Sequence, residues 1–258
     1  MHLMKRVFFA SLVLLLCLKV ASYGNGFAKS GKTFTEENKA ASEQTVLKQW
    51  KAGQKVSLNS AKSFGLEQCF TAEKISDRVF QRMRGKSYPQ GCSIPRASLR
   101  YVKVLHYTPH GDIQLGELVC HQNISADIVS IFKQLFEARY PIERMTLIDD
   151  YDADDERSMT ANNTSCFNYR VVAGSKKLSK HSQGRAIDIN PLYNPCVRLH
   201  TNGTRAVTPK AGKEYANRNK RTPYGINRND LCYRLFTAHG FIWGGNWRTV
   251  KDYQHFEK

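Results

Sequence analysis

Apolar residues recur every three to four positions in three stretches of the chain, at residues 71–83, 125–140 and 231–239. This spacing places them on one face of a helix, so three helices are predicted. The middle stretch has the clearest pattern, and Pro141 ends it. Its apolar face comprises Ile128, Ile131, Phe132, Leu135 and Phe136.

Other apolar stretches are short or alternate with polar residues, as strands do. Residues 99–107 and 113–120 flank a turn at Gly111, which predicts a β-hairpin. Further strands are predicted at 145–148, 167–172 and 186–189. Because helices and strands do not alternate regularly, the predicted class is α+β, with a small central antiparallel sheet flanked by helices.

The first 65 residues differ in composition from the rest. Lys5 and Arg6 precede an apolar run that is too short to span a bilayer comfortably. Residues 1–22 are therefore predicted to be a signal peptide, with a retained membrane anchor as the alternative. Residues 23–65 are polar and are interpreted as a spacer with one short helix, and 66–258 as one folded domain. We expect an exported monomer that keeps no membrane span after processing.

Six cysteines follow the predicted signal peptide, and an even number permits disulfides in an exported chain. No two have C-x-x-C spacing, which argues against a zinc site made of thiolates. We expect Cys69 to pair with Cys92 and Cys166 with Cys196. Buried free thiols are the alternative.

The formal net charge of +17 implies an anionic partner. Lysines and arginines are spread from Lys48 to Lys251 without a dense basic arm, which together with export argues against nucleic acid as that partner. We expect attraction to anionic polymers of the cell envelope, with simple solubility as the alternative. Five aspartates within 149–155 form an acidic island. A solvated loop is favoured there over a calcium site, because no glutamate follows at the spacing of a calcium loop.

The most informative segment is SKHSQGRAIDIN at residues 179–190, in which Asp188 follows His181 by seven positions. Gly184 permits a tight turn between them. Ala186, Ile187 and their neighbours favour a strand that carries Asp188. A side chain on the turn and another on the strand are therefore predicted to face the same point.

A second pair, Asp252 and His255, lies at the end of the chain. A carboxylate three residues before a histidine can share its face in a single turn, which places Asp252 beside a metal bound by His255. Two imidazoles and the Asp188 carboxylate suit Zn²⁺, although iron(II) and other divalent ions are alternatives. Three protein ligands leave a fourth position for water, as in catalytic zinc sites.

These motifs, S-x-H-x-x-G-x-A-x-D followed by D-x-x-H, resemble those of the zinc D-alanyl-D-alanine carboxypeptidase family, with its VanY-like enzymes, and of phage L-alanyl-D-glutamate endolysins. The likeness includes SMTANNTSCFNYR at 158–170 and the closing WGGNW, and extends over residues 99–258. It implies a hedgehog/DD-peptidase-like fold, with 66–258 as a zinc peptidase domain acting on peptidoglycan stem peptides. One zinc ion would be held by His181, Asp188 and His255, with Asp252 as general base and Arg170 steadying the substrate.

Substrate contacts are expected from Ser179 and from Trp243 and Trp247, with the core as the alternative place for both tryptophans. One competing hypothesis is a catalytically silent zinc module that binds the wall or a partner protein. That module would lack the base, whereas Asp252 is present. Another is a nucleic-acid-binding protein, whose affinity would persist after removal of the metal. The sequence leaves open whether a terminal or an internal bond of the stem peptide is cut.

Overall fold

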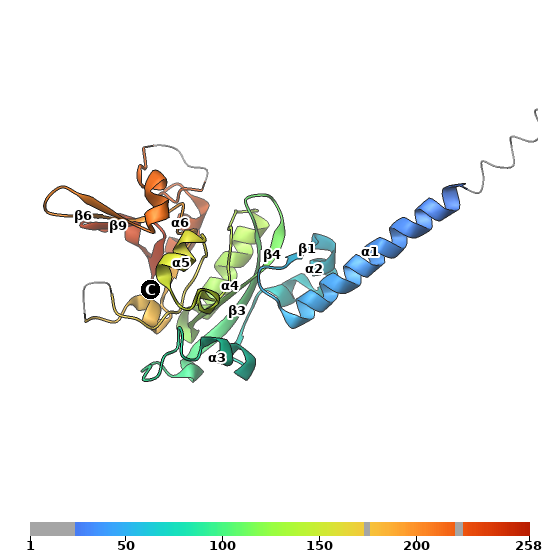
Figure 1. The fold of residues 1–258 in the computed structure, drawn as a ribbon, viewed down its shortest axis with the longest axis horizontal. Coiled ribbons are helices and arrows are strands. Elements are labelled where there is room, and N and C mark those ends of the chain that lie inside the picture. Colours follow the sequence, from blue (N-terminus) through green and yellow to red (C-terminus); the bar gives the residue numbers. More distant parts are fainter. Residues whose placement is uncertain (1–23, 173–175, 220–223) are drawn as a thin grey trace, which may run out of the picture.

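The largest sheet has four antiparallel strands, and β3 and β4 form its centre (Figure 1). The computed structural model describes residues 24–172, 176–219 and 224–258. The strand order is β1 (Lys55–Val56), β4 (Ile113–His121), β3 (Leu99–Tyr107) and β2 (Thr71–Lys74). β3 and β4 pair along their full length, with Val102 opposite Leu118. The predicted hairpin is therefore confirmed.

Helix α4 (Gln122–Glu137) packs against this sheet through the apolar face that the sequence predicts. Ile128, Ile131 and Phe132 are at most 1% exposed. The core continues through Phe236 of α6 (Leu231–Ala238), whose ring lies 6.4 Å from that of Phe132 and 4.4 Å from that of Phe256. This chain of aromatic contacts connects α4 to the C-terminal strands, where the candidate site lies.

Two three-stranded antiparallel sheets form the C-terminal part of the fold. One has the order β5 (Ala186–Asp188), β10 (His255–Glu257) and β8 (Ile242–Trp243). The other has the order β7 (Arg205–Thr208), β6 (Cys196–Leu199) and β9 (Val250–Asp252). Only Tyr253 and Gln254 separate β9 from β10, so the chain passes directly from one sheet into the other.

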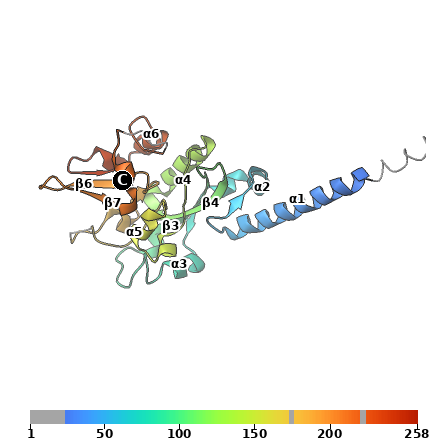
Figure 2. The same cartoon turned by 45° about the horizontal axis from the view of Figure 1, so that its top comes forward.

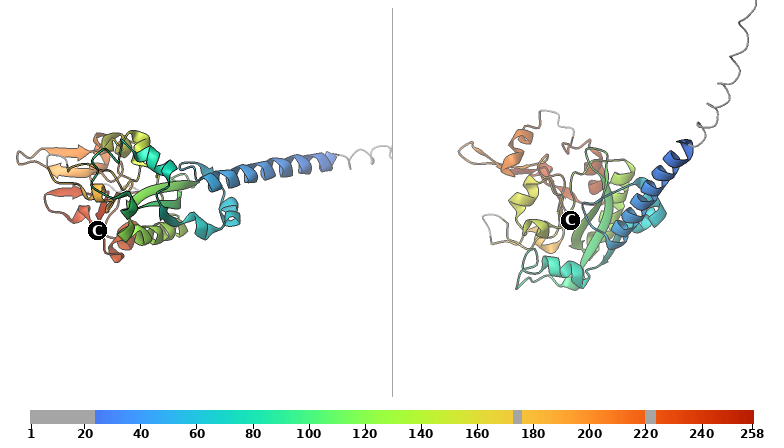
Figure 3. Two further views of the ribbon diagram at one scale, coloured as in Figure 1. Left: turned by 90° about the horizontal axis from the view of Figure 1, so that it is seen from below. Right: turned by 45° about the vertical axis from the view of Figure 1, so that its right-hand side comes forward.

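The other α-helices of the described residues are short, apart from α1. They are α1 (Gly24–Gln49), α2 (Leu58–Phe64), α3 (Asp77–Met83) and α5 (Asp155–Thr160). Helix α1 extends away from the rest of the chain (Figures 1, 2 and 3). Its C-terminal end is held by buried Leu47 and by Trp50, whose Nε1 donates to the carbonyl of Gly116. Short 3-10 helices are η1 (Leu66–Cys69), η2 (Arg96–Ser98), η3 (Ile148–Tyr151), η4 (Lys180–Gln183), η5 (Lys210–Ala216) and η6 (Gly244–Asn246).

The predicted signal peptide, residues 1–22, lies outside the described residues. The segment 23–65, interpreted as a spacer, contains α1, β1 and α2, and β1 pairs with the edge of β4. The domain division at residues 65 and 66 stays a prediction. In the ranges that the structure describes, no helix has both the length and the hydropathy needed to cross a membrane.

The α+β class is confirmed, as are the helices predicted at 125–140 and 231–239. The helix predicted over 71–83 is wrong in its first part, because Thr71–Lys74 form β2 and pair with β3. Helix α3 begins only after Ser76, whose hydroxyl accepts from the amide of Val79 and caps it. The strand at 186–189 is confirmed as β5. Those at 145–148 and 167–172 are wrong, because each segment makes one backbone hydrogen bond to β4 and no continuous ladder.

All six cysteines of the described residues are free thiols, so neither expected disulfide is present. The Sγ atoms of Cys69 and Cys166 donate to the carbonyls of Gly65 and Gly184. Cys69, Cys120, Cys166 and Cys232 are buried, as the alternative interpretation proposed.

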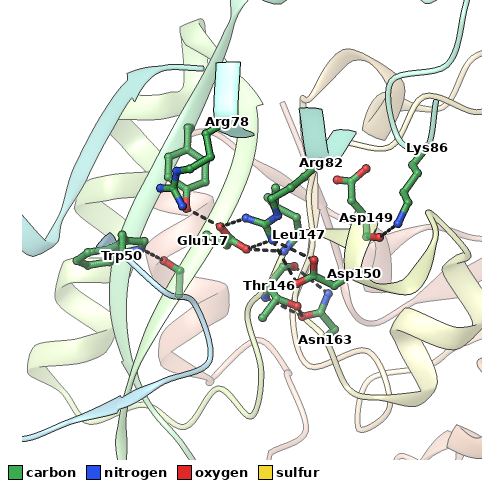
Figure 4. A network of polar contacts seen from close by, with 12 residues as sticks. Trp50, Arg78, Arg82, Lys86, Glu117, Thr146, Leu147, Asp149, Asp150 and Asn163 are labelled. Atoms are coloured by element: carbon green, nitrogen blue, oxygen red, sulfur yellow. Dashed lines mark hydrogen bonds and ion pairs between the residues drawn. The ribbon is translucent and has the colours of Figure 1, made fainter. Parts of the chain in front are cut away.

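The acidic island at 149–155 is held by basic residues (Figure 4). Glu117 of β4 is 1% exposed and accepts two hydrogen bonds from Arg82 of α3 and one from the amide of Leu147. Asp150 pairs with the same guanidinium. These contacts join α3, β4 and η3, and so fix the start of the acidic loop that leads to α5.

Candidate metal centre

His181 lies in η4, the turn that precedes β5. The hydroxyl of Ser179 caps this turn by accepting from the amide of His181 at 3.2 Å, and Gly184 ends it with a φ of 63°. The Nδ1 of His181 is 2.6 Å from the carbonyl oxygen of Cys166, which can only accept. Nδ1 therefore carries the proton of the neutral ring, and Nε2 presents a lone pair.

Asp188 and His255 are directly opposite each other on β5 and β10. Nδ1 of His255 lies 3.0 Å from Oδ1 of Asp188, and Nε2 of His181 lies 3.3 Å from Oδ2. The two ring nitrogens are 3.2 Å apart. All three side chains are buried. The structure thus brings together the three residues that the sequence motifs proposed as ligands.

This His-Asp-His cluster has dimensions that suit one metal ion. Its ligand atoms lie within 4.8 Å of one another, and no other such group occurs among the residues described. With zinc bonds of about 2.0 Å in a tetrahedron, ligand atoms are about 3.3 Å apart. The two ring nitrogens are 3.2 Å apart, which is close to that value, and they lie 3.0 and 3.3 Å from the two different oxygens of Asp188. The cluster could therefore hold a metal ion and leave a coordination position open.

Contacts within the cluster shift the pKa values of His255 and Asp188 in opposite directions. Burial alone would lower the pKa of His255, but hydrogen bonds with Asp188 and Glu257 outweigh it and raise that pKa to about 10. Burial alone would raise the pKa of Asp188, but His181 and His255 hold it well below its usual value. An arriving metal ion would therefore displace a proton from the cluster.

Asp252 ends β9, where it is opposite Cys196 of β6. Its Oδ1 is buried and has no hydrogen-bond partner. Burial raises the pKa of this carboxyl; His255 lowers it and Asp188 raises it further. A buried acceptor of this kind is costly unless a ligand or water satisfies it. A ligand or water is therefore expected to satisfy Oδ1.

The spacing predicted that Asp252 and His255 share a single turn, and this prediction is wrong. They end one strand and begin the next, with a bend at Tyr253 and Gln254. Gly244 of η6 lies against this bend, since an added Cβ would be 2.7 Å from the carbonyl oxygen of Asp252 and 3.2 Å from the Cβ of His255. This close approach gives a physical reason for the glycine in the WGGNW segment.

Arg170 lines the same cleft, and its guanidinium pairs with Asp155 at the start of α5. Its backbone amide donates to the hydroxyl of Ser182, in the turn that carries His181. The acidic island thus positions the arginine that the sequence proposed as a substrate contact. That role, like the one proposed for Ser179, stays a prediction.

The structure places one tryptophan in the core and the other at the cleft. Trp243 is 5% exposed, stacks with Phe256, and donates from Nε1 to the carbonyl of Tyr253, so it lies in the core. Trp247 lines the cleft, with its ring 5.2 Å from that of His255. A substrate contact is therefore expected from Trp247.

The cleft around the cluster has a volume of about 1190 Å³. Its lining includes Lys180, Arg198 and Glu257, which the sequence analysis did not single out. Glu257 lies 3.2 Å from Nε2 of His255. The spacing of Glu257 from His255 could have indicated this contact, because residues two apart on a strand share a face. It could be recognised only once His255 was known to lie on a strand.

Residues 173–258 match a family model described as D-alanyl-D-alanine carboxypeptidase. The matched segment contains the three cluster residues and Asp252. The resemblance is thereby confirmed over this part of the chain, and it supports a hydrolase of the peptidase class that acts on peptidoglycan. No curated protein and no solved structure matches the chain.

Proposed function

We propose that the protein is a zinc metallopeptidase that hydrolyses amide bonds in the stem peptides of peptidoglycan. The observation that carries this proposal is the convergence of His181, Asp188 and His255 beside Asp252, whose Oδ1 lacks a protein partner. A structural zinc site would close the fourth coordination position with a protein ligand. The cluster has three, and it opens into a large cleft.

A zinc ion bound here would polarise the scissile carbonyl and bring the pKa of a coordinated water toward about 7. Asp252 is the general base that accepts a proton from water and later delivers it to the leaving amine. Its raised pKa suits both steps, because the carboxyl takes up a proton more readily than an exposed aspartate does. Arg170 offers a permanent positive charge to the carbonyl oxygen or to a substrate carboxylate.

We further propose that the protein works outside the cytoplasm, as an exported or periplasmic monomer attracted to anionic envelope polymers. The formal net charge of +17 supports that attraction. Carboxypeptidase action on a terminal D-Ala-D-Ala bond and endopeptidase action within the stem both require the same amide hydrolysis at this site. Mass spectrometry of the products released from purified peptidoglycan distinguishes them.

Asp252→Asn tests the function directly. Because Asp252 is the base and not a ligand, this variant is expected to bind zinc at wild-type stoichiometry and to lose about 10²- to 10⁴-fold in turnover. Asp112→Asn is the matched control, since that carboxylate lies in an exposed pair with Lys55. Near-normal turnover by Asp252→Asn would remove it from the mechanism.

The silent zinc module predicts a different result. In that case the wild-type protein would bind zinc and peptidoglycan but release no peptides. The nucleic-acid hypothesis predicts that DNA affinity survives chelation of the metal and falls steeply with salt. The same preparation, assayed with and without chelator, therefore discriminates among the three functions.

A further inference from the structure

The two histidines of the cluster each have a second ring nitrogen that does not face the other ligands. For His181 this is Nδ1, which lies 2.6 Å from the carbonyl oxygen of Cys166. For His255 it is Nε2, which lies 3.2 Å from Oε2 of Glu257. Both outer partners are acceptors, so both hold a ring proton on the side away from the cluster.

The strand register explains why Glu257 occupies this place. His255 and Glu257 are two residues apart on β10, so both side chains are on the same face of the sheet. Phe256 between them is on the other face and fully buried. On the paired strand β5, Asp188 is opposite His255, and Ala186 is opposite Glu257. Ala186 adds only a methyl group to that face.

We propose that Glu257 is a positioning residue for the metal centre: its carboxylate accepts the Nε2 proton of His255 and so keeps Nδ1 free to bind the ion. This inference rests on the proposed zinc function. Without Glu257, the single proton of neutral His255 would be drawn to Nδ1, where Oδ1 of Asp188 is 3.0 Å away. The ring would then present a proton to the ion instead of a lone pair.

Carboxylate partners of this kind orient a ligand histidine and increase its basicity, and losing one costs about 10- to 100-fold in metal affinity. The side chain of Glu257 is 24% exposed, so it can be replaced without opening the core. Its Oε2 lies 3.2 Å from Nε2 of His255, so the carboxylate is directed toward the ring.

The test is a zinc titration against a competing chelator, with four proteins measured side by side. Glu257→Ala is expected to bind zinc about 10- to 100-fold more weakly than wild type. Glu257→Gln keeps an acceptor oxygen without the charge. It should bind zinc only about fivefold more weakly than wild type. Glu257→Lys offers only donors and is expected to bind more weakly than the alanine variant.

Glu67→Gln is the matched control, because Glu67 forms an exposed pair with Lys133 away from the cleft. Urea unfolding of the metal-free proteins shows whether each variant is folded. If the alanine variant is not folded, the lysine and glutamine variants still test the positioning role of Glu257. Affinities of Glu257→Ala and Glu257→Lys within about twofold of wild type would overturn the positioning role. A wild-type protein that binds no zinc would instead overturn the proposed function and this inference together.

Discussion

Gly184→Ala probes how the turn between two proposed ligands is held. Gly184 ends η4 with a positive φ of 63°, and its carbonyl accepts from the amide of His121 at the end of β4. An added Cβ would lie 2.7 Å from the amide nitrogen of His121 and 3.1 Å from the carbonyl carbon of Cys120. Both atoms belong to the backbone of the main sheet, so neither can move cheaply.

Two terms set the expected loss of stability. A left-handed conformation costs an alanine about 1 to 2 kcal/mol. Forcing a methyl group into an already packed region adds about 1 to 3 kcal/mol. Together they predict that Gly184→Ala lowers the free energy of unfolding by about 2 to 5 kcal/mol.

Urea unfolding measures this difference, and Gly111→Ala separates the two terms. Gly111 also has a positive φ, of 81°, but a Cβ there would meet nothing within 4 Å. Gly111→Ala should therefore lose only the conformational term, about 1 to 2 kcal/mol. Equal losses for the two variants would refute the proposed close contact between the His181 turn and β4.

Three further predictions concern the core and the cluster. Burial lowers the pKa of His106 to about 4, below the unfolded value of about 6.5. As the pH falls, the unfolded chain therefore takes up the proton first, and the free energy of unfolding drops by about 3 kcal/mol between about pH 6.5 and 4. Unfolding measured at several pH values should show a flatter pH dependence of this free energy for His106→Asn. Glu117→Gln removes the buried carboxylate partner of Arg82, which is 34% exposed and keeps its pair with Asp150, and should cost about 1.5 to 3 kcal/mol. Glu73→Gln, in an exposed pair, should cost less than about 1 kcal/mol by the same assay. Excess zinc should raise the thermal unfolding midpoint of the wild type by mass action but not that of His181→Ala, and an equal rise in both would contradict His181 as a ligand.

The cluster could be anticipated from the sequence because its parts are local. The eight residues from His181 to Asp188 contain most of the turn and all of β5, so the motif itself places both side chains. The hairpin at 99–120 and helix α4 were equally accessible, since their patterns persist over nine residues or more. Long periodic segments determine their own structure more strongly than short ones.

Contacts that depend on tertiary packing could not be predicted from the sequence. Thr71–Lys74 form a strand because they pair with β3, although Ile75, Val79 and Met83 after them suggested one continuous helix. The anchoring of Arg170 by Asp155 likewise requires α5 to lie next to the segment before η4. Such neighbours are set by tertiary packing, which can override local propensity.

The D-x-x-H spacing predicted a single turn, whereas the structure brings its two residues to the same cleft through two different strands. Asp252 and His255 belong to different sheets, and the two residues between them make the change of sheet. Both linking carbonyls are held, that of Tyr253 by Nε1 of Trp243 at 2.9 Å and that of Gln254 by the amide of Ile189 at 3.0 Å. Because a hydrogen bond holds the bend at each residue, we expect the proposed base and the proposed ligand to keep a fixed separation. The buried Trp243 thus holds, through the backbone, the connection between the proposed base and the proposed ligand His255.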